Sequence, residues 1–142
     1  MSKSNTLENS VLELIFKATA ITGIADNAGS GPLTSLYAAL HTSSPADTGN
    51  QSTNECAYSG YARVAVARSA VGFTVVANAV TPMANIDFPT CVAGTETATH
   101  FSLGVSSTGG TSILYHGSIS PTVSISAGVV PRLTTATTIT ED

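Results

Sequence analysis

One segment of the sequence, residues 60–68, constrains the fold more than any other because it alternates along its whole length. A period of two predicts an extended strand with one buried face and one face turned toward other groups. The first face holds Ala62, Val64 and Val66, and the second holds Tyr61, Arg63, Ala65 and Ala67. One arginine, one tyrosine and two methyl groups suit a face that a neighbour covers better than one left in water. We therefore predict a central strand of a small antiparallel sandwich that serves assembly.

The small number of charged residues also favours a protein that serves assembly. Charged residues make up 10% of the 142 residues, whereas soluble domains typically have roughly 25%. Hydrophobic residues make up 42%, which is enough to build the core of one domain. A polar but nearly uncharged surface is unusual for a solitary cytosolic enzyme, although some secreted β proteins share it. It fits a protein that is packed against copies of itself or other partners.

Charge and sequence order also exclude several classes of partner. The net charge is -4, and the five Lys and Arg are spread singly along the chain, so we expect no nucleic-acid partner. We find neither an apolar run long enough for a transmembrane helix nor the order of a signal peptide, so we expect no membrane partner and synthesis in the cytoplasm. Cys56 and Cys91 do not have CxxC spacing, and whether they pair is left open.

The N-terminal part of the sequence predicts the one helix, over residues 5–20. Asn5 and Glu8 have the spacing of a capping box, and a positive φ at Gly23 would end the helix. Apolar residues recur at helical spacing, and the face includes Leu7, Val11, Leu12, Leu14, Ile15, Phe16 and Ala18. The face is wide, so we expect the helix to lie on the sandwich or to dock onto a neighbouring subunit. Leu12 and Phe16 are therefore candidate intersubunit contacts.

The rest of the sequence predicts about eight short to medium strands. Their expected ranges are 33–42, 60–68, 73–77, 84–88, 97–105, 111–119, 121–125 and 129–139, with a short segment at 79–81 after the third. The clearest hairpin joins 97–105 to 111–119 through a turn of Ser, Thr and Gly. Residues 43–57 are rich in Ser, Thr, Asn, Pro and Gly and predict a long contact loop.

These elements predict an all-β chain with one N-terminal α-helix. An antiparallel β-sandwich fits best, as a jelly roll of about eight strands, and an immunoglobulin-like sandwich is the competitor. We expect residues 1–142 to form a single domain, with a helical arm at 5–20 and the sandwich at 33–140. We find no internal repeat in the sequence.

The sequence offers little for catalysis or metal binding. His41, His100 and His116 lie in separate expected strands without a local pair, so we expect them to face solvent or an interface and not zinc. No Gly-x-Ser-x-Gly elbow precedes a helix. Asp87 lies between two apolar residues without a second carboxylate nearby, which does not make a glycosidase pair. We therefore expect no catalytic, metal or cofactor-binding residues, no cofactor, and no enzymatic activity.

Three arginines are the cations of interest. Arg63, Arg68 and Arg132 stand out because the chain has so few charges. Arginine makes planar, forked hydrogen bonds and is favoured at interfaces. The alternative is that each occupies an ordinary strand surface. We name all three as candidate intersubunit contacts.

Several runs of residues together resemble a known family. They are residues 9–20, 32–42, 49–55 and 58–68, with Thr-His-Phe-Ser-Leu-Gly at 99–104 and the closing Thr-Thr-Ile-Thr-Glu-Asp. Their order and spacing resemble small virion proteins of tailed bacteriophages, whose members are often labelled tail-fibre-like. Chains of this size also look like capsid cement, or decoration, proteins. The resemblance implies a β-sandwich used in many copies, and it carries over no active-site residues.

We therefore expect a structural virion protein, and the first hypothesis is a cement protein on the capsid surface. It would bridge neighbouring major capsid proteins and form a homo-oligomer, a dimer or trimer, that stabilises the assembled shell by mass action. The second hypothesis is a tail or tail-fibre component. We favour the first because the sequence has no repeats and because the helix and the 43–57 loop could extend to neighbouring proteins. A carbohydrate-binding sandwich is a third, but the chain has no Trp and only four Tyr.

Overall fold

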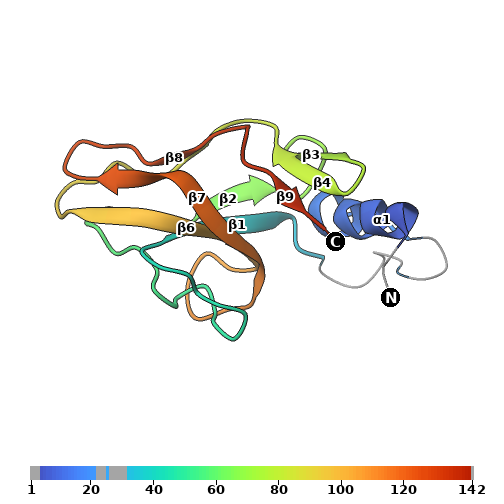
Figure 1. Ribbon diagram of the computed structural model, residues 1–142, viewed down its shortest axis with the longest axis horizontal. Coiled ribbons are helices and arrows are strands. Elements are labelled where there is room, and N and C mark those ends of the chain that lie inside the picture. Colours follow the sequence, from blue (N-terminus) through green and yellow to red (C-terminus); the bar gives the residue numbers. More distant parts are fainter. Residues whose placement is uncertain (1–3, 22–24, 26–31, 142) are drawn as a thin grey trace. The chain divides into compact units, whose positions relative to one another are not determined.

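The computed structural model describes residues 4–21, 25 and 32–141. These residues form one helix and nine strands (Figure 1). The elements are α1 (Asn5–Lys17), β1 (Ser35–His41), β2 (Val64–Ala67), β3 (Phe73–Val76), β4 (Ala79–Pro82), β5 (Ile86–Asp87), β6 (Glu96–Gly104), β7 (Ile113–Ile125), β8 (Arg132–Leu133) and β9 (Ile139–Thr140). The prediction of an all-β chain with antiparallel sheets and one N-terminal helix is confirmed.

The strands form three sheets within the described residues. Their orders are β2-β1-β6-β7, β3-β4-β9 and β5-β8, whereas a jelly roll has eight strands in two sheets. The chain divides into two compact units, which are described separately below. The first comprises Met1–Ser35, Ala67–Asn85 and Thr134–Asp142, and the second Leu36–Val66 and Ile86–Leu133. That the whole chain behaves as a single domain stays a prediction.

The helix of the first unit begins and ends close to the predicted positions. Its N-cap is Ser4, one residue before the predicted Asn5, and the Ser4 hydroxyl accepts a hydrogen bond from the Leu7 N–H. The helix ends at Lys17, and its C-cap Ala18 is left-handed with φ 58°. The predicted stop at Gly23 lies outside the described residues.

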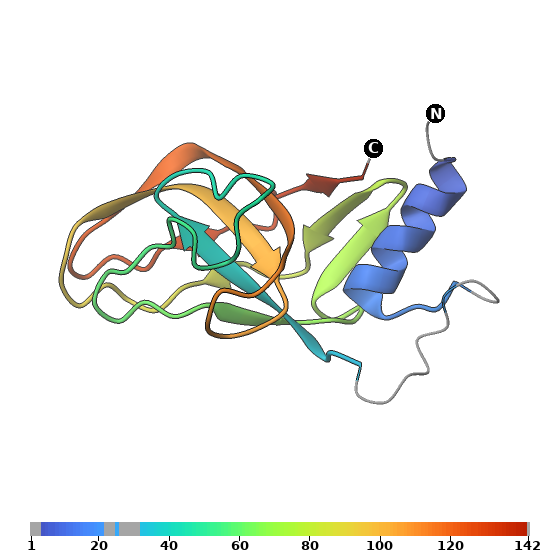
Figure 2. The ribbon, with the colours of Figure 1, turned by 90° about the horizontal axis from the view of Figure 1, so that it is seen from below.

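The apolar face of α1 packs on β3 and β4 of the same unit (Figure 2). Leu12 and Phe16 are fully buried. The Phe16 ring meets Phe73 edge-to-face, with 4.8 Å between ring centroids. Of the two placements that the sequence left open for this helix, the structure therefore shows packing on a sheet of its own chain.

The sheet on which the helix packs is small and closed by the C-terminal segment. β3 pairs with β4 through a tight turn at Ala77, and β4 pairs with β9. Asn78 extends this pairing, because its backbone carbonyl accepts from the Glu141 N–H and its side chain donates to the Glu141 carbonyl. The last residues of the chain thus complete a sheet that begins some 60 positions earlier.

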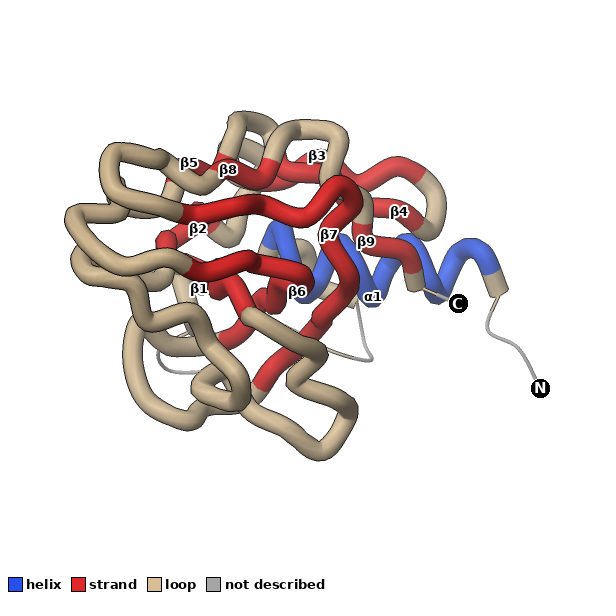
Figure 3. The backbone as a smooth tube through the Cα atoms, turned by 60° about the vertical axis from the view of Figure 1, so that its left-hand side comes forward, coloured by secondary structure: helices blue, strands red, loops and turns tan. Residues whose placement is uncertain are grey.

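The second unit contains most of the four-stranded sheet, which can be followed in Figure 3. Its inner strands are β1 and β6, paired antiparallel. The prediction that residues 60–68 form a central strand is wrong, because β2 is only four residues long and lies at an edge. The centre belongs to β1, whose last four residues are all buried and can therefore be covered on both faces.

The predicted alternation holds within β2 and fails just before it. Val64 and Val66 are more buried than the alanines that alternate with them. Ala62, however, is exposed and Arg63 is buried. The chain turns at Tyr61, whose N–H donates to the Tyr58 carbonyl, so the strand period does not extend that far back.

The predicted hairpin is confirmed as β6 and β7, which pair antiparallel. β7 is longer than expected because residues 121–125 continue the same strand. The register shifts twice, between Ala98 and His100 and between Leu103 and Gly104. Each shift places extra residues on β7 and changes the side to which the following side chains point.

The remaining sheet of the second unit is the short ribbon of β5 and β8. Ile86 and Leu133 of this ribbon are buried, and so is Phe88, which directly follows β5. The Tyr61 ring stacks on Phe88 at 6.3 Å between centroids and meets Tyr58 edge-to-face at 5.3 Å. Aromatic contacts therefore join the ribbon to the segment that leads into β2.

Candidate functional site

The most elaborate polar site of the chain surrounds Arg63 in the second unit. Its side chain is only 3% exposed, and its Nε lies 2.7 Å from the Glu55 Oε1. Its Nη2 donates to the other Glu55 oxygen at 2.8 Å, so the pair is bidentate. The hydrogen bond to Glu55 raises the pKa of Arg63. A buried pair of this kind is stable only while both partners remain.

Arg63 also joins two loops that are distant in sequence. It donates to the backbone carbonyls of Ser106 and Gly109 and to the Ser52 hydroxyl. Glu55 and Ser52 belong to the 43–57 loop, whereas Ser106 and Gly109 belong to the connection between β6 and β7. One guanidinium therefore positions both loops, and the 43–57 loop is held by specific bonds along its second half.

Gln51 anchors the centre of the 43–57 loop against the sheet. It is fully buried, donates from Nε2 to the Tyr37 carbonyl, and accepts from the Thr111 hydroxyl. It lies directly over Gly104, where an added Cβ would come within 2.1 Å of the Gln51 side chain. Gly104 is therefore required for the amide to approach the backbone so closely.

His41 provides a further buried anchor for the same loop. It is fully buried, so the expectation that it faces solvent or an interface is wrong. Its Nδ1 lies 2.8 Å from the Thr53 carbonyl and must donate, so its Nε2 accepts from the Ser102 hydroxyl at 2.8 Å. Desolvation lowers the pKa of His41, with a smaller opposing effect from the bond to Thr53. The neutral imidazole is thus the form that the fold selects.

Acidification should destabilise the chain through His41. The pKa of His41 is lowered in the fold, so below the ordinary value of about 6.5 the unfolded chain binds more protons than the folded chain. The stability that neutral His41 supports is complete above that value. It is lost as the pH falls toward the folded pKa, by up to about 1.4 kcal/mol per pH unit. Urea unfolding between pH 7 and pH 5 measures this slope.

The matched variants are His41→Gln and His116→Gln. The first removes the buried titrating group and should flatten the slope between pH 7 and pH 5. His116 is partly exposed, so its variant is the control for replacing a histidine that the fold does not bury. Equal slopes for the wild type and His41→Gln would contradict the assignment of this pH dependence to His41. Glu55, Arg63 and His100 also act on His41, and all three remain in both variants.

Tyr61 and the two cysteines complete the buried polar region. The Tyr61 hydroxyl donates to Glu55 at 3.0 Å and accepts from the Leu40 N–H at 3.1 Å, and burial raises its pKa. Cys56 and Cys91 are both free and buried. Burial, with the nearby Glu96, raises the pKa of Cys56 to about 12, so its thiol stays protonated and unreactive at neutral pH.

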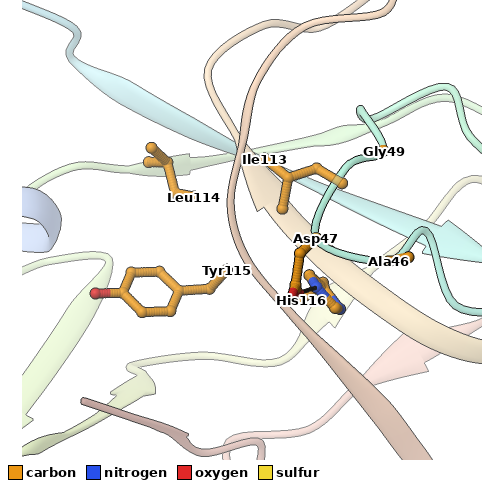
Figure 4. Close-up of a pocket in the computed structure, with 7 residues that line it drawn as sticks. All are labelled: Ala46, Asp47, Gly49, Ile113, Leu114, Tyr115 and His116. Carbon is orange, nitrogen blue, oxygen red and sulfur yellow. Dashed lines mark hydrogen bonds and ion pairs between the residues drawn. The ribbon is translucent and has the colours of Figure 1, made fainter. Parts of the chain in front are cut away.

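A shallow hollow of about 310 Å³ opens beside the 43–57 loop. Its lining comes from the loop and the first residues of β7, namely Ala46, Asp47, Gly49, Ile113, Leu114, Tyr115 and His116 (Figure 4). The His116 Nε2 lies 3.2 Å from the Asp47 Oδ1, and the Asp47 side chain is 99% exposed. This pair is open to solvent, in contrast to the buried pair of Arg63 and Glu55.

The second register shift decides which of the β7 side chains point toward the 43–57 loop. Ile113 and His116 point toward the loop, whereas Leu114 and Tyr115 point to the opposite side (Figure 4). Two consecutive residues on one side break the strand alternation because Leu114 has no partner on β6. Regular alternation would have placed Ile113 and Tyr115 on the same side, and the bulge at Leu114 separates them.

The described residues contain no group of three His, Cys, Asp or Glu side chains placed to bind a metal ion. Over the same part of the chain, no helix is long and apolar enough to cross a membrane.

The five predicted contact residues have structural partners within their own units. Arg68 donates to the carbonyls of Leu14 and Ile15, where α1 ends, and so satisfies groups that the helix leaves unpaired. Arg132 pairs with Asp87 across the ribbon and lowers the pKa of that carboxyl. Arg63, Leu12 and Phe16 are buried. Intersubunit contact stays a prediction for all five, and Arg132 has the most exposed side chain of the five.

Comparison with known proteins identifies the family. No curated protein matches the chain. Residues 2–140 match the family described as podophage GP4 fiber I protein gp80. This match spans nearly the whole of both units and agrees with the resemblance to small phage virion proteins. The chain therefore belongs to the podophage GP4 fiber I protein gp80 family and is a structural protein of the phage virion.

Proposed function

We propose that the chain is a fibre-type subunit attached to the phage tail. The family match over residues 2–140 carries this proposal, because the name of the family specifies a fibre protein. The proposed partners are copies of the same chain and a protein of the tail. We propose no role for nucleic acid, membrane or a cofactor, and no catalysis.

The arrangement of the second unit supports a binding role of this kind. The 43–57 loop is bonded at three of its residues: Glu55 to Arg63, Thr53 to His41, and Gln51 to the Tyr37 carbonyl. A loop that is ordered before binding loses little conformational freedom when a partner covers it. The few charges of the chain also keep the cost of desolvating its surface low.

A capsid cement protein is the second candidate. The sequence has no internal repeat of the kind that fibre shafts use, and both of its units are compact. In this role the chain would sit on the capsid surface, bridge major capsid proteins and stabilise the assembled lattice by mass action. Many weak contacts would then act together.

Copy number and position separate the two candidates. Quantitative gels of purified virions, calibrated on the major capsid protein, should show few copies per particle if the chain is a tail fibre subunit. Antibody labelling should then mark the tail. Copies in a fixed ratio to the major capsid protein, with label over the head, would overturn the fibre proposal and support the cement candidate. Particles lacking the protein should retain the heat resistance of their heads under the fibre proposal and lose it under the cement candidate.

A further inference from the structure

Asp47 is an exposed carboxylate that has no Lys or Arg partner within the described residues. Three other described carboxylates do pair with such cations, namely Glu13 with Lys17, Glu55 with Arg63 and Asp87 with Arg132. The Asp47 side chain is 99% exposed, and its Oδ1 lies 3.2 Å from the His116 Nε2. Its other oxygen, Oδ2, has no partner in the described part of the chain. Asp47 can therefore accept a further hydrogen bond from outside the chain.

The turn that carries Asp47 is fixed by local bonds. The Gly49 N–H donates to the Ala46 carbonyl at 3.1 Å, and the Ala46 N–H donates to the Ser44 hydroxyl at 3.2 Å. A Cβ added at Gly49 would come within 2.0 Å of the Pro45 carbonyl oxygen, so the turn requires glycine there. Ala46 is left-handed, with φ 57°, a conformation that costs free energy for a residue with a Cβ. The turn thus holds the carboxylate in place before a partner binds.

The hollow beside Asp47 suits the end of one long cationic side chain. None of the described residues that line it is Lys or Arg. The Ile113 side chain points toward the loop (Figure 4) and provides an apolar surface next to the carboxylate. The volume of about 310 Å³ is at the lower end of the range for ligand pockets, roughly 300–1,000 Å³. An apolar surface that leads to an acceptor matches a side chain with a methylene stem and a charged end.

We propose that this hollow receives a lysine side chain of the tail protein to which the chain attaches. The ammonium donates to the Asp47 Oδ2, and the methylene stem lies along Ile113. Lysine fits better than arginine because His116 already contacts Oδ1, whereas a guanidinium binds a carboxylate best through both oxygens. The exposed, uncharged Thr48 and Asn50 form the polar rim of the contact.

A second copy of the chain is a poorer source of this cation. The described cations are all bonded within their own units, Lys17 to Glu13, Arg63 to Glu55, Arg132 to Asp87 and Arg68 to the backbone carbonyls at the end of α1. Moving one of them to Asp47 of another copy would break a bond that its own unit makes. A different protein with an uncommitted lysine carries no such cost, so charge complementarity favours a different protein as the partner.

This contact deepens the proposed function and rests on it, because it specifies how the fibre subunit would recognise the tail. The two can fail separately. The position of antibody label on the virion tests the proposed function. The dependence of binding on Asp47, measured with purified full chain and particles that lack the protein, tests the contact.

Charge-matched variants measure that dependence. Asp47→Asn and Asp87→Asn each remove one negative charge from an exposed side chain, so they change the net charge equally. Asp47→Asn should raise the dissociation constant for the particles about tenfold or more, and Asp47→Lys should abolish binding. Asp87→Asn should bind as the wild type does. All three should keep the circular dichroism of the wild type. Equal binding by Asp47→Asn and Asp87→Asn would overturn the proposal.

Zero-length cross-linking identifies the partner. A carbodiimide joins a carboxylate to an amine in contact with it, with loss of water, and mass spectrometry of the bound particles locates the joined residues. The expected product links Asp47 to a lysine of a tail protein, and Asp47→Asn should not form it. A link from Asp47 to a lysine of a second copy would overturn the proposal, as would the absence of any link from Asp47. A link to a lysine of the major capsid protein would support the lysine contact and overturn the tail as its source.

Discussion

Replacing Phe16 with alanine should lower the free energy of unfolding by about 4 kcal/mol. The Phe16 side chain is fully buried and packs edge-to-face on Phe73. Truncation removes that contact and leaves a cavity between α1 and the sheet of β3 and β4, which only partial relaxation can fill. Urea unfolding monitored by far-ultraviolet circular dichroism measures the loss, because the first unit contains the described helix.

Leu7→Ala is the matched control on the same helix. The Leu7 side chain is 42% exposed, so its truncation should cost about 1 kcal/mol or less. If Phe16→Ala were no more destabilising than Leu7→Ala, the packing of α1 on its sheet would be contradicted. The same result would revive docking of the helix onto a neighbouring subunit, where Phe16 would be exposed in the isolated chain.

Replacing Arg63 with methionine should lower the free energy of unfolding by about 3 kcal/mol. Methionine keeps much of the side-chain volume but removes the charge, so Glu55 remains as a largely buried carboxylate without its partner. The carbonyls of Ser106 and Gly109 lose their donor as well. Denaturant unfolding measures the loss, and faster proteolysis within the 43–57 loop should accompany it.

Two further variants distinguish the effect of breaking a buried ion pair from the effect of losing any arginine. Arg132→Met breaks an exposed pair with Asp87 and should leave the unfolding midpoint unchanged. Glu55→Gln added to Arg63→Met removes the stranded charge and should recover part of the lost stability. An Arg63→Met variant as stable as Arg132→Met would show that the buried network does not hold the loop.

The elements that the sequence predicted correctly are those whose signal is local. The helix at α1 follows from apolar residues at helical spacing, and the β6–β7 hairpin follows from two alternating runs around a Ser/Thr/Gly turn. The predicted ends of these two elements differ little from the observed ones. The cap moved by one residue to Ser4, and β7 extends through Pro121 because an edge strand tolerates a proline.

The candidate site was less accessible to sequence reasoning. Arg63 was singled out as an unusual cation and a candidate intersubunit contact, but its burial within its own unit was not predicted. Its partner Glu55 lies in a loop with almost no apolar residues, and Gln51 carries no motif. The available signals were the single Glu in that loop and the glycine at position 104. Neither residue predicts a contact by itself, because only the structure shows that the 43–57 loop packs against β1.

By itself, the sequence determined the secondary structure class, the leading helix, the main hairpin and the scarcity of charge. These follow from periodicity and composition, which act over a few residues. The tertiary structure alone decided that β1 and not β2 lies in the sheet centre, that Arg63 and His41 are buried, and that Asp47 meets His116 beside the hollow. These features depend on which distant segments meet, because the burial of a polar group is favourable only when its hydrogen-bonding partners are brought to it.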